Sequence, residues 1–237
     1  MAVRIAAAGD VHCRESDPDT PRREFAALNG AGIDLVLLAG DLTTHGEPEQ
    51  GAMAAAACRE VDAPVLAVLG NHDWHADRAA ELVEVLAAAG VIVLDRSTAT
   101  LQAGGVEVGV VGLKGFVGGF AGSHLPDFGE PLLRAVYREA SADVEALDRG
   151  LREVALCPLR LALLHYAPTE ETLEGEPRGI HAFLGTDRLA APIREHEPDL
   201  VLHGHAHRGV FEASLGPVPI RNVAVHVTGK DFELFRL

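Results

Sequence analysis

The 237-residue chain is long enough to bury a substantial core, and we expect residues 1–237 to form a single domain. Its 35 acidic and 20 basic side chains give a formal charge of −15, which argues against duplex nucleic acid as a partner because such proteins usually present a basic stripe. No apolar stretch reaches about 18 residues, so no membrane span is expected. The three cysteines are scattered without a CxxC spacing, which favours a reducing, cytoplasmic location.

Strands and helices alternate through the first half of the chain. Apolar runs predict strands, and the Ala-rich or amphipathic segments between them predict helices, in the order strand 3–8, helix 21–29, strand 33–39, helix 47–59, strand 64–69 and helix 77–89. Gly90 is placed to end the last of these helices, and short strands follow at 91–94, 98–102 and 106–112. This alternation indicates a parallel sheet whose strands bring their carboxyl ends to one edge.

Residues 114–127 interrupt the alternation with a glycine-rich segment that contains Phe116 and Phe120. We expect both phenylalanines to be exposed, in a segment that is either a flexible connection or a wall on the substrate side. An exposed phenylalanine-rich loop could also support a homo-oligomer. Beyond it the pattern predicts a helix at 132–154, a strand at 159–164, a helix at 186–195 and strands at 199–202, 209–212, 220–225 and 232–237, the last two joined by a turn at Gly229-Lys230.

Five short polar segments carry the side chains best suited to chemistry, and most of them directly follow a predicted strand. If each strand delivers its polar end to the same edge of a sheet, residues far apart in the sequence converge on one pocket. Alternate strand residues face the same way, so the Asp-x-His and His-x-His pairs should each point together. The segments are Asp10-Val11-His12, Gly40-Asp41, Gly70-Asn71-His72-Asp73, His165 and Gly204-His205-Ala206-His207.

The donors in these segments are carboxylate, amide-oxygen and imidazole groups, with no cysteine. Such a mixed set suits Mn, Fe, Zn, Co or Ni better than Mg or Ca. Seven donors are too many for one tetrahedral zinc but suit two metals that share a carboxylate. The alternative is that they are ordinary turn residues, because Gly, Asn and Asp favour turns for backbone reasons. The expected ligands are Asp10, His12, Asp41, Asn71, His165, His205 and His207.

In this order the motifs resemble those of the calcineurin-like metallophosphoesterase superfamily, over residues 10–207. The resemblance implies an α/β fold, a four-layer αββα sandwich of two mixed sheets flanked by helices. It also implies His72 as the catalytic histidine with Asp73 as its acidic neighbour. By the same resemblance, a first metal would take Asp10, His12, Asp41 and His207, and a second would take Asp41, Asn71, His165 and His205.

Two differences from the superfamily's protein phosphatases indicate which branch of the superfamily this sequence resembles. Thr44 and His45 occupy the positions of a further Asp-Arg pair in those phosphatases, and Asp73 occupies the position of a glutamate. Neither departure removes an expected ligand. The resemblance therefore favours the bacterial-type phosphodiesterase and phosphatase branch over a Ser/Thr protein phosphatase.

The expected reaction is hydrolysis of a small or nucleotide-like phosphoester by a metal-bridging hydroxide, with Mn the favoured metal of the pair. His72 would protonate the leaving oxygen, and Asp73 would orient the imidazole. A phosphodiesterase is favoured over a phosphomonoesterase or a nucleotide pyrophosphatase. A nuclease is disfavoured by the acidic charge, and a catalytically silent scaffold by the complete ligand set.

Several further polar side chains receive a structural interpretation. We expect His45, His75, His124, His181, His196 and His226 to be mostly surface or loop residues, and Cys13 to be an inert thiol near the metals. Lys114, Arg134 and Arg138 could contact phosphate, although such charges more often cover a solvated face.

Overall fold

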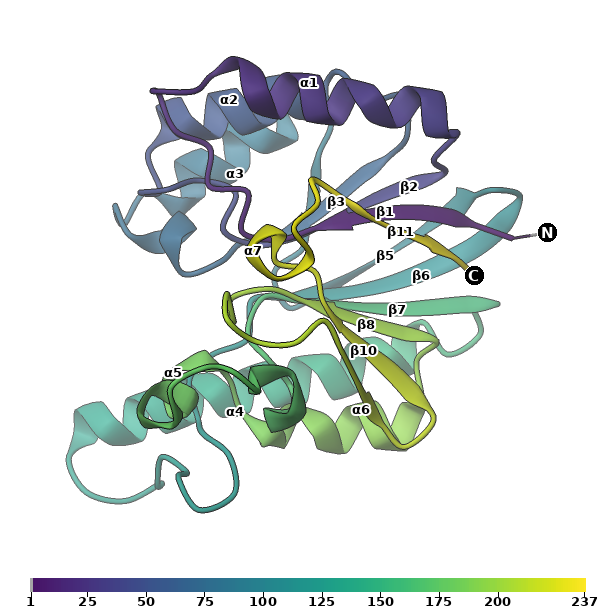
Figure 1. Ribbon diagram of the computed structural model, residues 1–237. Helices are drawn as coiled ribbons and strands as arrows, with labels where there is room; N and C mark the ends of the chain where they lie inside the picture. The colour runs from purple at the N-terminus through teal and green to yellow at the C-terminus, as the bar shows by residue number, and fades with distance from the viewer. Residues whose placement is uncertain (1) are drawn as a thin grey trace.

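The computed structural model describes residues 2–237. Two β-sheets pack face to face, and helices cover the outer face of each sheet (Figure 1). The predicted four-layer αββα sandwich is confirmed.

The first sheet has the strand order β11-β1-β2-β3-β4. Its strands β1 to β4 are parallel, with Ile5 opposite Leu35 in the β1–β2 pair. Strand β11 runs antiparallel to β1 at the other edge. The strands are β1 (Arg4–Ala8), β2 (Leu35–Ala39), β3 (Val65–Val68), β4 (Ile92–Val93) and β11 (Glu233–Arg236), and the covering helices are α1 (Asp19–Ala27), α2 (Pro48–Cys58) and α3 (Ala79–Ala87).

The second sheet has the order β5-β6-β7-β8-β10-β9. Its inner strands β6, β7, β8 and β10 are parallel, and antiparallel hairpin partners β5 and β9 form the edges. The strands are β5 (Ser97–Ala103), β6 (Val106–Leu113), β7 (Leu159–Leu164), β8 (Leu200–His203), β9 (Glu212–Leu215) and β10 (Val218–Asn222), and the accompanying helices are α4 (Pro131–Glu153), α5 (His181–Leu184) and α6 (Ala190–His196).

Alternation along the strands builds the core. Ile5 and Leu37 of the first sheet face Val110 and Leu161 of the second, and all four are fully buried between the sheets. The neighbouring residues of each strand point outward and pack under the helices. Both faces of each central strand are therefore buried, which explains the nearly continuous apolar runs in the sequence.

The C-terminal region differs from the prediction. The predicted strand at 209–212 is wrong, because the Gly209 and Val210 amides donate to the Ala206 and Thr172 carbonyls of neighbouring loops, and the strand β9 begins only at Glu212. The hairpin β9–β10 turns at Gly216 instead, which adopts φ +64°. The expected strand 220–225 ends at Asn222, and Val225–Thr228 forms the short helix α7. Consequently β10 and β11 belong to different sheets and are not joined by a simple turn.

Residues 114–127 also differ from expectation. Phe116 is half-buried, and Phe120 is only 2% exposed, packed with Leu173 and Leu184. The Gly118 and Gly119 amides donate to carbonyls of the α5 region, which fixes the segment against the second half of the chain. The expectation of exposed phenylalanines is therefore wrong, and it no longer supports a homo-oligomer.

Within residues 2–237, no helix combines the length and the apolar character that crossing a bilayer requires.

Candidate metal centre

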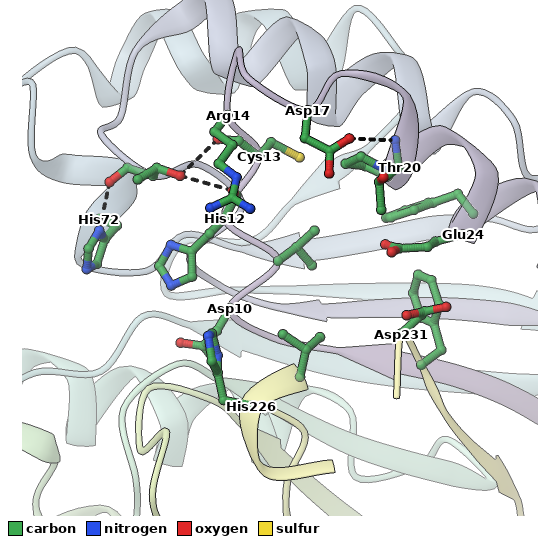
Figure 2. A pocket seen from close by; sticks show the side chains of 16 residues that line it. Asp10, His12, Cys13, Arg14, Asp17, Thr20, Glu24, His72, His226 and Asp231 are labelled. Atoms are coloured by element: carbon green, nitrogen blue, oxygen red, sulfur yellow. Dashed lines mark hydrogen bonds between the residues drawn. The ribbon is translucent and has the colours of Figure 1, made fainter. Parts of the chain in front are cut away.

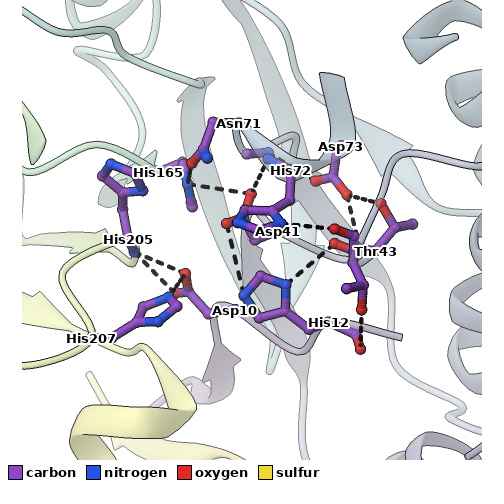
Figure 3. Close-up of polar contacts among 12 residues, drawn as sticks. Asp10, His12, Asp41, Thr43, Asn71, His72, Asp73, His165, His205 and His207 are labelled. Atoms are coloured by element: carbon purple, nitrogen blue, oxygen red, sulfur yellow. Dashed lines mark hydrogen bonds and ion pairs between the residues drawn. The ribbon is translucent and has the colours of Figure 1, made fainter. Parts of the chain in front are cut away.

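The expected metal ligands gather where the strands of both sheets end, in the loops that follow β1, β2, β3, β7 and β8 (Figure 3). Their ligand atoms form two clusters, and within each cluster the atoms lie within 4.8 Å of one another. Asp41 is the one residue common to both clusters. The first cluster is Asp10, His12, Asp41 and His207, and the second is Asp41, His165 and His205.

Left-handed backbone, rather than strand alternation, aims several of these side chains. Asp10, His12, Asp41 and His205 have φ values of 60°, 50°, 52° and 69°. Residues with a side chain rarely adopt this conformation, and it concentrates at functional sites where the surrounding structure holds it. The prediction that Asp-x-His and His-x-His align as strand residues is therefore wrong, because both pairs lie in tight loops beyond the strand ends.

Glycines make room for the ligands at two close approaches. A Cβ atom on Gly70 would lie 2.0 Å from Asp41 Oδ1, and one on Gly204 would lie 2.4 Å from Asp10 Oδ2. Gly70, which precedes Asn71, therefore leaves the space that the Asp41 carboxylate of the neighbouring loop occupies. This explains physically why glycine stands next to ligands in the motifs.

The first cluster is organised around Asp10. Its buried carboxylate accepts hydrogen bonds from the His205 amide at 3.0–3.1 Å and from His207 Nε2 at 2.8 Å. His12 Nδ1 faces the Thr43 carbonyl at 3.3 Å, so in the neutral ring this nitrogen donates and Nε2 presents its lone pair. That Nε2 lies 3.9 Å from Asp41 Oδ2.

The second cluster is organised around His165, which is fully buried. Its Nδ1 lies 2.8 Å from the Ala39 carbonyl and must donate to it. The lone pair of Nε2 then faces Asn71 Oδ1 at 2.9 Å and Asp41 Oδ1 at 3.4 Å. His205 Nε2 lies 3.1 Å from the Phe183 carbonyl, which leaves Nδ1 as its free acceptor.

These contacts fit divalent cations. Around His165, its own Nε2, Asn71 Oδ1 and Asp41 Oδ1 converge as three acceptors with no donor between them when the ring is neutral, an arrangement that a cation stabilises. In the first cluster, Asp41 Oδ2 is buried and has no hydrogen-bond partner within residues 2–237. A buried unpaired carboxylate oxygen is costly unless a cation balances it. The structure therefore contains a candidate dinuclear metal site.

Burial and hydrogen bonding shift the pKa values of the expected ligands in different directions. Burial raises the pKa of Asp41. Burial opposes ionisation of Asp10 as well, but its His207 hydrogen bond and the nearby imidazoles hold the pKa of Asp10 below its usual range. Burial lowers the pKa of His12 to about 4 and that of His205 to about 3. Both rings are therefore neutral at pH 7, as metal ligation requires.

His72 and Asp73 lie beside the clusters, and their side chains contact different partners. The His72 amide donates to Asp41 Oδ1 at 2.8 Å, and its Nδ1 lies 2.7 Å from the Thr44 carbonyl, which leaves Nε2 available. The predicted contact between Asp73 and the His72 ring is not found. Every hydrogen bond that the Asp73 carboxylate makes within residues 2–237 comes from Leu42, Thr43 or Gly70.

His226 is the residue at the centre that sequence reasoning missed. It is exposed, as expected, but its ring stacks on His207 with centroids 4.2 Å apart and planes 8° apart. Helix α7 brings His226 next to His207. No motif in the sequence indicates that this C-terminal segment lies at the metal centre. Among the histidines expected to be mostly surface or loop residues, His181 is an exception, because its side chain is 8% exposed.

Other side chains singled out from sequence lie apart from the clusters. The Lys114 ammonium lies 4.4 Å from the Phe116 ring centroid and donates to the Gly115 carbonyl. Arg134 and Arg138 are exposed on α4, as a solvated helix face predicts. Cys13 is buried next to Thr43, and burial raises the pKa of its thiol to about 12, consistent with an inert group.

Two sheets flanked by helices, with a shared carboxylate between two His-rich clusters at one edge, define a metal-dependent hydrolase. The family described as calcineurin-like phosphoesterase matches residues 3–209. The chain belongs to this family, and it is a metallophosphoesterase. No curated protein sequence matches the chain.

Solved structures show the same fold at low sequence identity. Phosphopantetheinyl hydrolase (PptH) from Mycobacterium tuberculosis aligns with a TM-score of 0.69 at 14% identity, over 98% of this chain and 95% of its own. TT1561 of Thermus thermophilus aligns with a TM-score of 0.62 at 19% identity, over 99% of each chain. The purple acid phosphatase PPD1 from yellow lupin aligns with a TM-score of 0.56 at 13% identity, over 94% of this chain and 44% of its own.

Proposed function

We propose that the protein is a dinuclear-metal phosphodiesterase that acts on small or nucleotide-like phosphoesters. The observation that carries this proposal is the sharing of Asp41 between two ligand clusters. The first metal would be held by Asp10, His12, Asp41 and His207, and the second by Asp41, Asn71, His165 and His205. Manganese is our first choice, because the donors mix oxygen with imidazole nitrogen and include no thiolate.

The protein's own groups supply positioning and a proton. When bound, two divalent cations provide Lewis acidity that activates water and offsets charge on the phosphate oxygens. The Thr44 carbonyl fixes Nδ1 of His72 as a donor, so Nε2 can carry the proton that a leaving oxygen takes. Asp73 acts indirectly in this scheme, because its hydrogen bonds hold the loops that present Asp41 and His72.

A cavity of about 460 Å³ favours a diester over a monoester. It opens beside Asp10, His12 and His72, and it has room for an organic group on the phosphate in addition to the leaving group. A nucleotide pyrophosphatase would use the same space. The acidic charge of the chain continues to disfavour a nuclease.

We also propose a cytoplasmic location, supported by three free cysteines, two of which are buried. Fractionation of cells that express the tagged protein would test this, and a periplasmic or secreted product would contradict it.

The test compares two chromogenic esters. Metal-stripped protein is reloaded with Mn²⁺ and assayed on bis-p-nitrophenyl phosphate and on p-nitrophenyl phosphate. We expect faster cleavage of the diester, and loss of activity in Asp41→Asn but not in Asp62→Asn, an exposed aspartate in the connection between α2 and β3. A preference for the monoester would contradict the diesterase proposal, and full activity in Asp41→Asn would contradict the dinuclear one.

A further inference from the structure

A backbone carbonyl orients three of the four expected ligand histidines. In each of these rings one nitrogen lies against the carbonyl, which fixes the plane of the ring and the position of its proton, so the other nitrogen is left to bind a metal. The three contacts join Nδ1 of His12 to the Thr43 carbonyl at 3.3 Å, Nδ1 of His165 to the Ala39 carbonyl at 2.8 Å, and Nε2 of His205 to the Phe183 carbonyl at 3.1 Å.

His207 lacks such a partner. Its one hydrogen bond within residues 2–237 is donated by Nε2 to Asp10 Oδ1 at 2.8 Å. Ligation requires the neutral ring with a free lone pair on the nitrogen that faces the cluster, so this hydrogen bond is lost when His207 and Asp10 bind a metal. The side chain is 35% exposed, which makes His207 the ligand histidine that needs another contact to hold its plane.

A flat ring lies where that contact is needed. The imidazole of His226 stacks on His207 with centroids 4.2 Å apart and planes 8° apart, and it stands edge-on to His12 with centroids 6.0 Å apart. It therefore contacts both imidazoles of the first cluster. Figure 2 shows His226 beside Asp10, in the wall of the cavity that opens next to this cluster.

Backbone hydrogen bonds tie His226 to the loop that carries Asp10. The Gly9 amide donates to the Val223 carbonyl at 2.9 Å, and the Val225 amide donates to the Gly9 carbonyl at 3.0 Å. Gly9 directly precedes Asp10, and Val225 is the first residue of α7. The ring of His226, one residue further along, is thus presented by a segment fixed to the first cluster.

We propose that His226 is a positioning residue of the first metal site, because its stacked ring holds the plane of His207 in the orientation that ligation requires. The inference rests on the proposed function, since it takes His207 as a ligand of the first metal. The face of His226 carries the effect, because neither of its ring nitrogens forms a hydrogen bond within residues 2–237.

The test measures metal affinity separately from catalysis. Metal-stripped protein is titrated with Mn²⁺, and the free ion is followed by its EPR signal. We expect His226→Ala to lower the affinity of one site about tenfold, as for loss of an orienting contact, and to leave the other site unchanged. His226→Phe, which keeps a flat ring, should stay within about threefold of the unmodified protein.

A matched variant controls for the loss of an exposed histidine. His124 is exposed, and its ring contacts Asp187 at 2.9 Å and none of the expected ligands within residues 2–237. His124→Ala should therefore keep both Mn²⁺ affinities of the unmodified protein.

A double-mutant cycle assigns the effect to His207. In a His207→Ala background the ring that His226 holds is gone, so His226→Ala should cause no further loss of Mn²⁺ affinity. A loss by the same factor in both backgrounds would show that His226 acts independently of His207 and would overturn the proposal.

The remaining outcomes separate this inference from the proposed function. Two unchanged affinities in His226→Ala, or a His226→Phe variant as weak as His226→Ala, would overturn the stacking role and leave the dinuclear centre. Equal losses at both sites in His226→Ala would overturn it as well, because the ring contacts the imidazoles of the first cluster. Binding of fewer than two Mn²⁺ by the unmodified protein would instead overturn the dinuclear function, and this inference with it.

Discussion

The carboxylate of Asp73 accepts a hydrogen bond of 2.7 Å from the hydroxyl of Thr43, and through this contact the loop after β3 is tied to the loop after β2. The same carboxylate accepts the amides of Thr43, Leu42 and Gly70. Both tied loops carry expected metal ligands. Asp73 thus sets the distance between ligands without touching the candidate metal positions.

Replacing this acceptor should destabilise the fold. In Asp73→Asn, an amide group would face backbone donors, so at least one buried N–H loses its partner, at a cost of roughly 1–3 kcal/mol in the free energy of unfolding. Urea unfolding of the metal-free protein measures this. Thr43→Ser, which keeps the hydroxyl, serves as the control. Full stability combined with lost activity would contradict the structural role and would indicate that Asp73 takes part directly in catalysis.

A methyl group at Gly70 should disrupt metal binding. Its Cβ would lie 2.0 Å from Asp41 Oδ1, so the shared carboxylate must move. We expect Gly70→Ala to lower metal affinity by about 10–100-fold, as for other changes that displace ligands indirectly. Metal content after dialysis gives the measurement. Gly30→Ala, where a Cβ meets no atom within 4 Å, should retain both metals. Retention of two metals in Gly70→Ala would contradict the described packing.

The proposed acid role of His72 predicts dependence on the leaving group. His72→Asn should slow hydrolysis of an alkyl ester by about 10²–10⁴-fold, and that of a p-nitrophenyl ester much less, because p-nitrophenolate leaves without a proton. The matched variant His75→Asn alters a nearby ring, 6.3 Å from that of His72, and should change neither rate. Equal losses on both esters would show that His72 supports the site rather than donating a proton.

Much of this site was predictable because each ligand follows an apolar strand. The carboxyl ends of Arg4–Ala8, Leu35–Ala39 and Val65–Val68 meet at one edge of the first sheet, so the convergence follows from a parallel sheet alone. The pairing of ligands into two clusters needed the family resemblance. Their orientation was not predictable, because left-handed backbone at Asp10 and Asp41 replaces strand alternation.

The errors share a physical cause, which is contact between segments distant in sequence. Asp73 follows His72 directly, yet the turn at Asn71 sends the two side chains to different partners. His226 reaches His207 only because α7 packs against the strand-end loops. The glycine-rich surroundings of Phe120 favour exposure, but α5 and its neighbours cover the ring.

Metal binding should release a proton from His207. The hydrogen bond to Asp10 raises the pKa of His207, so in weakly acidic solution more of the metal-free molecules carry this proton than an ordinary histidine would. Ligation requires the neutral ring, and metal affinity should therefore fall as the pH falls through this raised pKa. Burial keeps His12 and His205 neutral in weakly acidic solution, so they release none.

Calorimetric titration with Mn²⁺ at pH 6.5, in two buffers of different ionisation enthalpy, counts the protons released. The same titration at pH 8.5 should give a smaller count. Equal enthalpies in both buffers at pH 6.5 would contradict the assignment of His207 as a ligand.

The most direct test of the account is a crystal structure of the Mn²⁺-loaded protein with data collected at the manganese absorption edge. We expect two anomalous peaks at the strand-end edge, with the carboxylate of Asp41 bound to both and His165 to one of them. A single peak, or two peaks that Asp41 does not join, would contradict the shared-carboxylate centre on which the proposed function depends.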